Sequence, residues 1–192
     1  MKKTIFITIA ITIVSFLILL AIVFGALMFF APLSLATLSK NVGNDNMAIY
    51  FYEVQYGKTG DINDLKTLLY QVNAEKNYTL SAKYSKIMVE DGGFAALSRS
   101  EDEADKTGLK FADYVYGNYA VALYETGAEA EEIFALDTYE DYRKDNIYQF
   151  LLDDDKVKQD GEFLVKIKEK LEEFEQNEIL QKDKDYIEIL LR

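Results

Sequence analysis

The chain has 192 residues and a net charge of −12, from 33 acidic and 21 basic side chains. Histidine and cysteine are absent, which excludes Ser-His-Asp and Cys-His catalysis, imidazole or thiolate metal sites, and disulfides. A strongly acidic protein repels phosphate backbones, so we expect no nucleic-acid partner.

The first predicted element is an apolar helix. Thr4 to Ser39 forms a run of 36 residues without a charge. Because a membrane helix needs about 20 apolar residues, we expect residues 5–30 to cross a lipid bilayer. A cleaved signal peptide is the alternative, but its apolar region has only about 7–15 residues. Residues 1–33 are therefore interpreted as a cytoplasmic tip and an uncleaved signal anchor.

The charges beside this anchor predict its direction. Lys2 and Lys3 precede it, whereas Lys40 is the only basic residue close to its other end. All 33 acidic residues follow Lys40, so residues 40–192 carry a net charge of −14. Basic residues favour the cytoplasmic side. We therefore expect a single-pass protein of the cell membrane, with the N-terminus in the cytoplasm and the rest outside.

The remainder of the chain reads as a juxtamembrane tether, 34–45, and an acidic, all-helical extracytoplasmic domain, 46–192. Apolar residues recur there at helical spacing, as at Leu65, Leu68, Leu69 and Val72. Ser100 and Glu103 match a capping box, which indicates a turn or a new helix. Residues 153–161 read as a charged loop. The predicted helices span 46–56, 62–73, 78–90, 94–97, 109–126, 130–136, 139–152, 162–176 and 186–191.

Four glycines recur at a regular interval. Gly60, Gly93, Gly127 and Gly161 are separated by 33, 34 and 34 residues. Thirty-four residues is the length of a tetratricopeptide helix–turn–helix repeat. An apolar residue stands thirteen positions before each glycine; these residues are Met47, Leu80, Tyr114 and Tyr148.

The outer domain therefore resembles the tetratricopeptide family of α-helical repeats, over about residues 46–176. Two groups of positions in the first repeat carry the resemblance: Ile49, Tyr52, Tyr56 and Gly60, then Leu65, Leu69 and Val72. The sequence departs from the family at Glu53, where the pattern has glycine, and at Leu65, where it has alanine. The resemblance implies antiparallel helix pairs stacked as a short α-solenoid. An irregular helical bundle is the alternative within the same all-α class.

The resemblance also implies a concave groove for a peptide or a partner's helix. Its candidate lining residues are Tyr50, Val54, Tyr114 and Tyr124. We expect a protein-interaction adaptor or scaffold at the membrane surface, without catalytic activity, cofactor or metal ion. The alternative is an extracytoplasmic carrier or sensor that holds a small apolar ligand or lipid among its Tyr and Phe rings.

Overall fold

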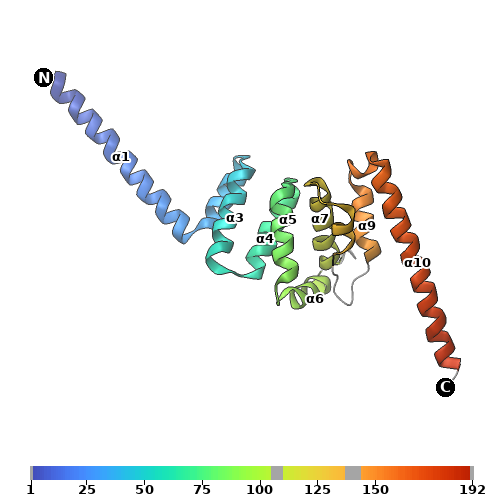
Figure 1. Ribbon diagram of the computed structural model, residues 1–192. Coiled ribbons are helices and arrows are strands. Elements are labelled where there is room, and N and C mark those ends of the chain that lie inside the picture. The colour runs from blue at the N-terminus through green and yellow to red at the C-terminus, as the bar shows by residue number, and fades with distance from the viewer. Residues whose placement is uncertain (1, 105–109, 137–143, 191–192) are drawn as a thin grey trace. The chain divides into compact units, whose positions relative to one another are not determined.

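The prediction of an all-α protein is confirmed. The computed structural model describes the backbone of residues 2–104, 110–136 and 144–190, and the side chains of 7–101, 110–136 and 146–177. These residues form helices and no strand (Figure 1). The elements are α1 Lys2–Phe30, α2 Pro32–Asn41, α3 Asp45–Thr59, α4 Ile62–Ala74, α5 Tyr78–Glu90, α6 Phe94–Ala104, α7 Phe111–Glu125, α8 Ala130–Phe134, α9 Lys144–Asp153, the 3₁₀ turn η1 Val157–Gln159, and α10 Gly161–Leu190.

The chain divides into two compact units. Unit 1 is Met1–Gln71 and unit 2 is Val72–Arg192, so the boundary falls inside α4. The sequence predicted one domain over 46–192. The difference arises because α3 packs with the two helices before it, α1 and α2, within unit 1.

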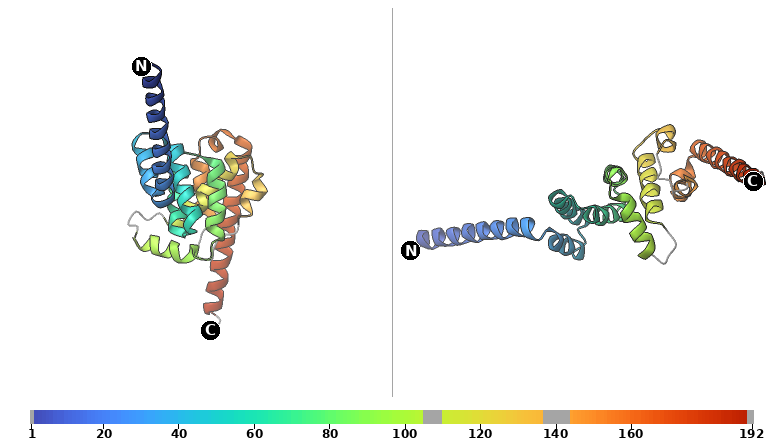
Figure 2. Two further views of the ribbon diagram at one scale, coloured as in Figure 1. Left: turned by 90° about the vertical axis from the view of Figure 1, so that its left-hand side faces the viewer. Right: turned by 90° about the horizontal axis from the view of Figure 1, so that it is seen from below.

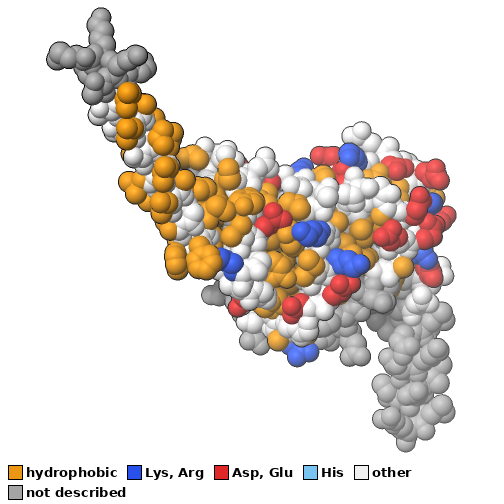
Figure 3. Space-filling model, turned by 60° about the vertical axis from the view of Figure 1, so that its left-hand side comes forward, with side chains coloured by type: hydrophobic (Ala, Val, Ile, Leu, Met, Phe, Trp, Pro, Cys, Tyr) orange, Lys and Arg blue, Asp and Glu red, His pale blue; other side chains and the backbone are white. Residues whose placement is uncertain are grey.

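Helix α1 has the length and composition of a membrane span. Ile7–Phe30 has a mean hydropathy of 3.0, and none of its apolar window is buried inside the protein. Its side chains are apolar on every side rather than on one stripe, which is typical of a helix surrounded by lipid. Figure 3 shows this apolar surface continuing along α1 to its junction with the rest of unit 1.

Most of the predicted tether, residues 34–45, is helical, because residues 32–41 form helix α2. Pro32 occupies the first turn of α2, where its missing N–H has no helical partner to lose. Leu35 and Ala36 turn inward and form a small core with Phe51 of α3. The residues directly after the apolar helix therefore begin a second helix.

Polar contacts complete unit 1. Asp64 of α4 accepts hydrogen bonds from Gln55 at 2.9 Å and Thr59 at 2.6 Å, both on α3. Lys40 of α2 donates a bond of 2.8 Å to Gln71 of α4. Gly60 ends α3 with a positive φ of 59°, a conformation that glycine adopts without strain.

Unit 2 is built around α7. Helix α5 packs on one side of α7 and α9 on another, and two views draw the three helices in the order α5, α7, α9 (Figures 1 and 2). A Cβ added at Gly117 of α7 would overlap the ring of Phe150 on α9. Glycine is required here because the two helices approach so closely.

Two further helix predictions are corrected. The capping box at Ser100 does not start a helix, because α6 continues through it from Phe94 to Ala104. The expected final helix, 186–191, is not separate, because α10 continues to Leu190 as one 30-residue helix. The predicted start of a helix at Tyr139 lies outside the described residues. The charged loop before α10 contains the short turn η1.

Candidate functional site

The four predicted groove residues are divided between the two units. Tyr50 and Val54 lie on α3 in unit 1, where Tyr50 is 46% exposed and Val54 is half-buried. The edge of the Tyr50 ring contacts the ring of Phe51, with centroids 5.5 Å apart. Tyr114 and Tyr124 lie on α7 in unit 2, ten residues apart, or about 15 Å along the helix.

Tyr114 contributes to the packing inside unit 2. Its side chain is half-buried, and its hydroxyl accepts a hydrogen bond of 3.1 Å from Asn73. Asn73 also accepts a bond of 2.6 Å from Ser81 of α5. Burial raises the pKa of the Tyr114 hydroxyl, which keeps it neutral. Tyr114 therefore joins α7 to the segment that precedes α5.

Tyr124 lies in a surface pocket of about 350 Å³. The pocket opens between the C-terminal turn of α7, the start of α8, and the start of α10. Two aromatic rings, five charged side chains and three small residues line it. These are Tyr124 and Phe163; Glu129, Lys156, Asp160, Glu162 and Lys166; and Gly127, Ala128 and Ala130.

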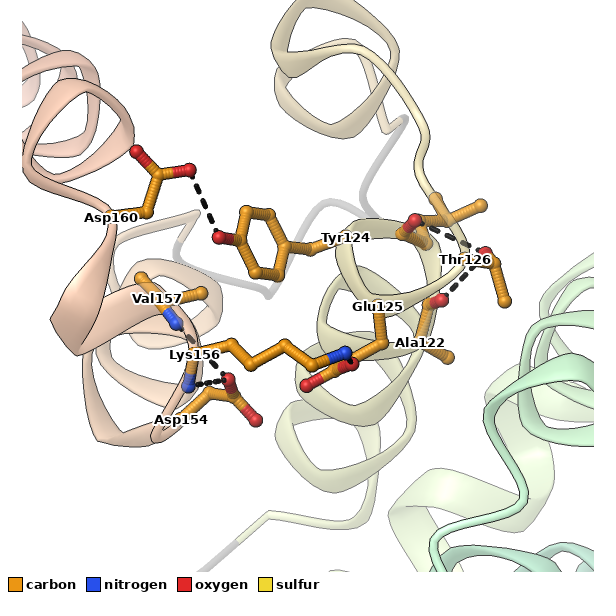
Figure 4. Close-up of polar contacts among 9 residues, drawn as sticks. Ala122, Tyr124, Glu125, Thr126, Asp154, Lys156, Val157 and Asp160 are labelled. Carbon is orange, nitrogen blue, oxygen red and sulfur yellow. Dashed lines mark hydrogen bonds and ion pairs between the residues drawn. The ribbon is translucent and has the colours of Figure 1, made fainter.

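Asp160 positions Tyr124 in this pocket. The Tyr124 hydroxyl donates a hydrogen bond of 3.0 Å to Oδ2 of Asp160 (Figure 4). Oδ1 of the same carboxylate accepts the backbone N–H of Phe163 at 3.0 Å, which caps the N-terminus of α10. The two oxygens of Asp160 thus join α7 to α10.

The neighbouring residue on α7 makes a second connection. Glu125 forms an ion pair with Lys156, although the Glu125 side chain is only 4% exposed. Lys156 is held in place by a turn, because Oδ1 of Asp154 accepts the backbone N–H groups of Lys156 at 2.8 Å and Val157 at 3.2 Å. Val157 is fully buried and anchors this turn. Figure 4 shows both connections side by side.

The electrostatics of the pocket follow from these bonds. Desolvation, followed by the hydrogen bond to Asp160, raises the pKa of Tyr124 to about 12. The N–H of Phe163 and the Tyr124 hydroxyl lower the pKa of Asp160. The bond to Glu125 raises the pKa of Lys156. At neutral pH the pocket therefore contains a neutral phenol, an ionised carboxylate and an ionised ammonium group.

Aromatic packing fixes the inner wall of the pocket. The ring centroid of Phe163 lies 4.6 Å from that of Tyr124. The Phe163 ring is also stacked on the ring of Phe134, with centroids 5.8 Å apart. Phe134 meets the edge of Tyr148, which in turn contacts Phe174 further along α10. These contacts tie α7, α8, α9 and α10 together. Rings held in this way offer rigid apolar area with little entropy left to lose on binding.

Most residues of the pocket were missed from the sequence. Only Tyr124 was predicted as a binding residue; Asp160, Lys156 and Phe163 were assigned to a charged loop and a helix start. Asp160 followed by Gly161 is a helix-start signal that could have been recognised. In the part of the chain that the structure describes, no group of three or more acidic side chains could hold a metal ion.

Two of the five charged side chains that line the pocket are held by the bonds described above, Asp160 by Tyr124 and Lys156 by Glu125. No protein-family model, no curated protein and no solved structure matches this chain. The site must therefore be interpreted from its own geometry.

Proposed function

We propose that this chain is a single-pass protein of the cell membrane that acts as a protein-interaction adaptor or scaffold. In this proposal α1 is the signal anchor, its N-terminus is cytoplasmic, and the helices after it lie outside. The pocket beside Tyr124 binds a segment of another protein. The observation that carries the binding proposal is this pocket, with its rigid aromatic wall and its charges of both signs.

The membrane anchor is supported by two features of α1. The helix is long enough to span a bilayer, and no residue of its apolar window is buried inside the protein. Exposing such an apolar surface to water would be unfavourable in free energy, whereas contact with lipid removes this cost. The direction rests on Lys2 and Lys3 at the N-terminal end.

The charges of the pocket favour a basic partner segment. Three acidic side chains face it, whereas one of its two lysines, Lys156, is already paired with Glu125. The surrounding domain is strongly acidic as well. An arginine of the partner could stack on Tyr124 and donate to Asp160 or Glu162, a combination that is favourable at protein interfaces.

The alternative of an apolar-ligand carrier gains no support from this pocket. Five of its ten lining residues are charged. Burying an apolar ligand or a lipid tail against them would remove water from ionised groups without replacing their hydrogen bonds. A polar peptide avoids this cost.

The relation to helix–turn–helix repeats remains part of the proposal. In its favour, each of the four regularly spaced glycines follows one helix and precedes another, or begins it, in the pairs α3/α4, α5/α6, α7/α8 and α9/α10. The second helices have 13, 11, 5 and 30 residues, however. The pairs are therefore unequal, as in the irregular bundle that the sequence left open.

Peptide binding by the full-length chain in lipid nanodiscs tests this function. We expect a fluorescent pool of random peptides with a fixed central arginine to bind more tightly than the same pool with a fixed central glutamate. Glu162→Gln, an exposed change in the pocket, should weaken the binding of the arginine pool. Glu90→Gln, an exposed change on α5, is the matched control and should leave it unaltered. Equal binding of the two pools would contradict the proposal.

A further inference from the structure

Helix α1 is longer than a bilayer requires. Its 29 residues extend for about 44 Å at 1.5 Å per residue, whereas the hydrocarbon core is about 30 Å thick. Part of the helix must therefore lie outside the hydrocarbon, or the helix must tilt. The contacts within unit 1 distinguish these two cases.

Two side chains in the last two turns of α1 contact α3. The ring of Phe24 meets the edge of Phe51, with centroids 6.2 Å apart. Met28 packs against the small core that Phe51 forms with Leu35 and Ala36 of α2. The segment from Phe24 onward is thus joined to the folded part of unit 1.

Lys58 of α3 reaches the end of the same helix. Its ammonium group donates to the carbonyl oxygens of Phe29 and, at 3.4 Å, of Met28. It also lies 4.6 Å from the centroid of the Phe29 ring. These carbonyls have no partner further along α1, so a cation here satisfies them and favours the helix dipole.

Helix α3 cannot enter the hydrocarbon. It carries Asp45, Glu53 and Lys58, and charged groups at the centre of a bilayer are strongly disfavoured. The residues of α1 that α3 contacts must then lie at or above the headgroups. This leaves Thr4–Val23 for the hydrocarbon, and these 20 residues extend for about 30 Å. The length agrees with the thickness of the hydrocarbon without tilt.

The uncovered side of this segment remains apolar. Phe29 is 65% exposed and Phe30 is 81% exposed, and Leu33 at the start of α2 is also exposed. Full exposure of these rings to water would be unfavourable, whereas the headgroup layer accommodates apolar groups beside polar ones. Lys58 places a positive charge at the same level, where lipid phosphates lie.

Resting on the proposed membrane anchor, we propose that Phe29, Phe30, Leu33 and Lys58 form a collar that binds the phospholipid headgroup layer. The occupant follows from continuity, because the collar extends the lipid-facing surface of α1 without a break. The hydrocarbon boundary lies between Val23 and Phe24. The collar joins unit 1 directly to the membrane surface and leaves no free tether between them.

Depth measurements on single-cysteine variants test the collar, since the natural chain has no cysteine. Leu20→Cys and Phe30→Cys are made in the full-length chain, labelled with an environment-sensitive fluorophore, and placed in liposomes. The liposomes contain lipids that carry a spin-label quencher either on the headgroup or in the middle of the acyl chain. Lys86→Cys, an exposed position on α5, is the aqueous reference.

We expect the headgroup quencher to act more strongly than the acyl-chain quencher at position 30, and the reverse at position 20. Lys58→Gln should reduce headgroup quenching at position 30, whereas Lys86→Gln should not.

Stronger acyl-chain quenching at position 30 would overturn the collar and leave the anchor intact. Iodide quenching at position 30 equal to that at position 86 would also overturn it. So would protection of position 30 from iodide that persists without lipid, through contact with a second copy of the chain. Iodide access at position 20 would refute the anchor itself.

Discussion

Asp160 accepts hydrogen bonds from both the Tyr124 hydroxyl and the backbone of Phe163, each at 3.0 Å. One carboxylate therefore caps α10 and orients the half-buried Tyr124 ring of the candidate site. The stability of the α10 start and the shape of the pocket are coupled through this residue.

Asp160→Ala should lower the melting temperature more than Asp160→Asn. Alanine removes both the cap and the acceptor for Tyr124, whereas asparagine retains one acceptor oxygen and is an equally good N-cap residue. Thermal unfolding of the full-length chain in detergent micelles, followed by circular dichroism, measures the difference. Equal melting temperatures for the two variants would contradict the capping role.

The advantage of Asp160 over asparagine should also depend on pH. The pKa of Asp160 is lowered from 3.8 in the folded state by its bonds to Phe163 and Tyr124. Its stabilising contribution is present above pH 3.8 and is lost as the pH falls through the folded pKa. The difference in melting temperature between the wild type and Asp160→Asn should therefore shrink on acidification. A constant difference from pH 6 to pH 2 would count against the lowered pKa.

Tyr124 should ionise later than an ordinary tyrosine. Its pKa is raised from 10.0 to about 12 by desolvation and by the Asp160 carboxylate. The neutral phenol favours the folded state, so this contribution is present below pH 10 and is lost as the pH rises through about 12. The absorbance of tyrosinate at alkaline pH, compared between the wild type and Tyr124→Phe, isolates this group. If the difference between the two titrations placed the ionisation of Tyr124 near pH 10, the effect of desolvation and of Asp160 on its pKa would be excluded.

Gly117→Ala should destabilise unit 2, because the added methyl group would overlap Phe150. Overpacking of this kind costs about 1–3 kcal/mol. Gly57→Ala is the matched control, since Gly57 lies inside α3 with open space around it. Alanine there should stabilise the helix by about 0.5–1 kcal/mol. Denaturant unfolding of the two variants should shift in opposite directions, and shifts of the same sign would refute the close approach.

The pair of Glu125 and Lys156 should be coupled. Lys156→Met leaves the covered carboxylate of Glu125 without its cation, so it should destabilise the chain more than the double variant with Glu125→Leu. A double-mutant cycle on the melting temperature measures the coupling. The exposed pair of Lys86 and Glu90 on α5 serves as the comparison and should show little coupling. Additive effects at Glu125 and Lys156 would contradict the connection.

Local patterns predicted the helices better than their assembly. The stripe of Leu65, Leu68 and Val72 correctly indicated α4, because helical spacing places such residues on one buried face. Helix α2 was not predicted within residues 34–45, although Pro32 just before them is a residue that favours the first turn of a helix. The capping-box prediction failed at Ser100, because a short polar segment cannot show whether an existing helix continues through it.

The pocket beside Tyr124 was harder to predict, for a physical reason. Tyr124 and Asp160 are separated by 36 residues, and no periodic pattern connects them. Their proximity depends on how α7, α8 and α10 pack, which is set by aromatic contacts such as that between Phe134 and Phe163. Gly117 is a similar case, since only the position of Phe150 explains it.

Labelling of single cysteines in intact cells tests the membrane-anchored adaptor most directly. Lys86→Cys and Lys3→Cys are treated with a membrane-impermeant maleimide before and after lysis. We predict labelling at position 86 in intact cells, and at position 3 only after lysis. Labelling at position 3 in intact cells with position 86 protected would reverse the orientation. Recovery of the chain in the soluble fraction after lysis would contradict the anchor and, with it, the central claim.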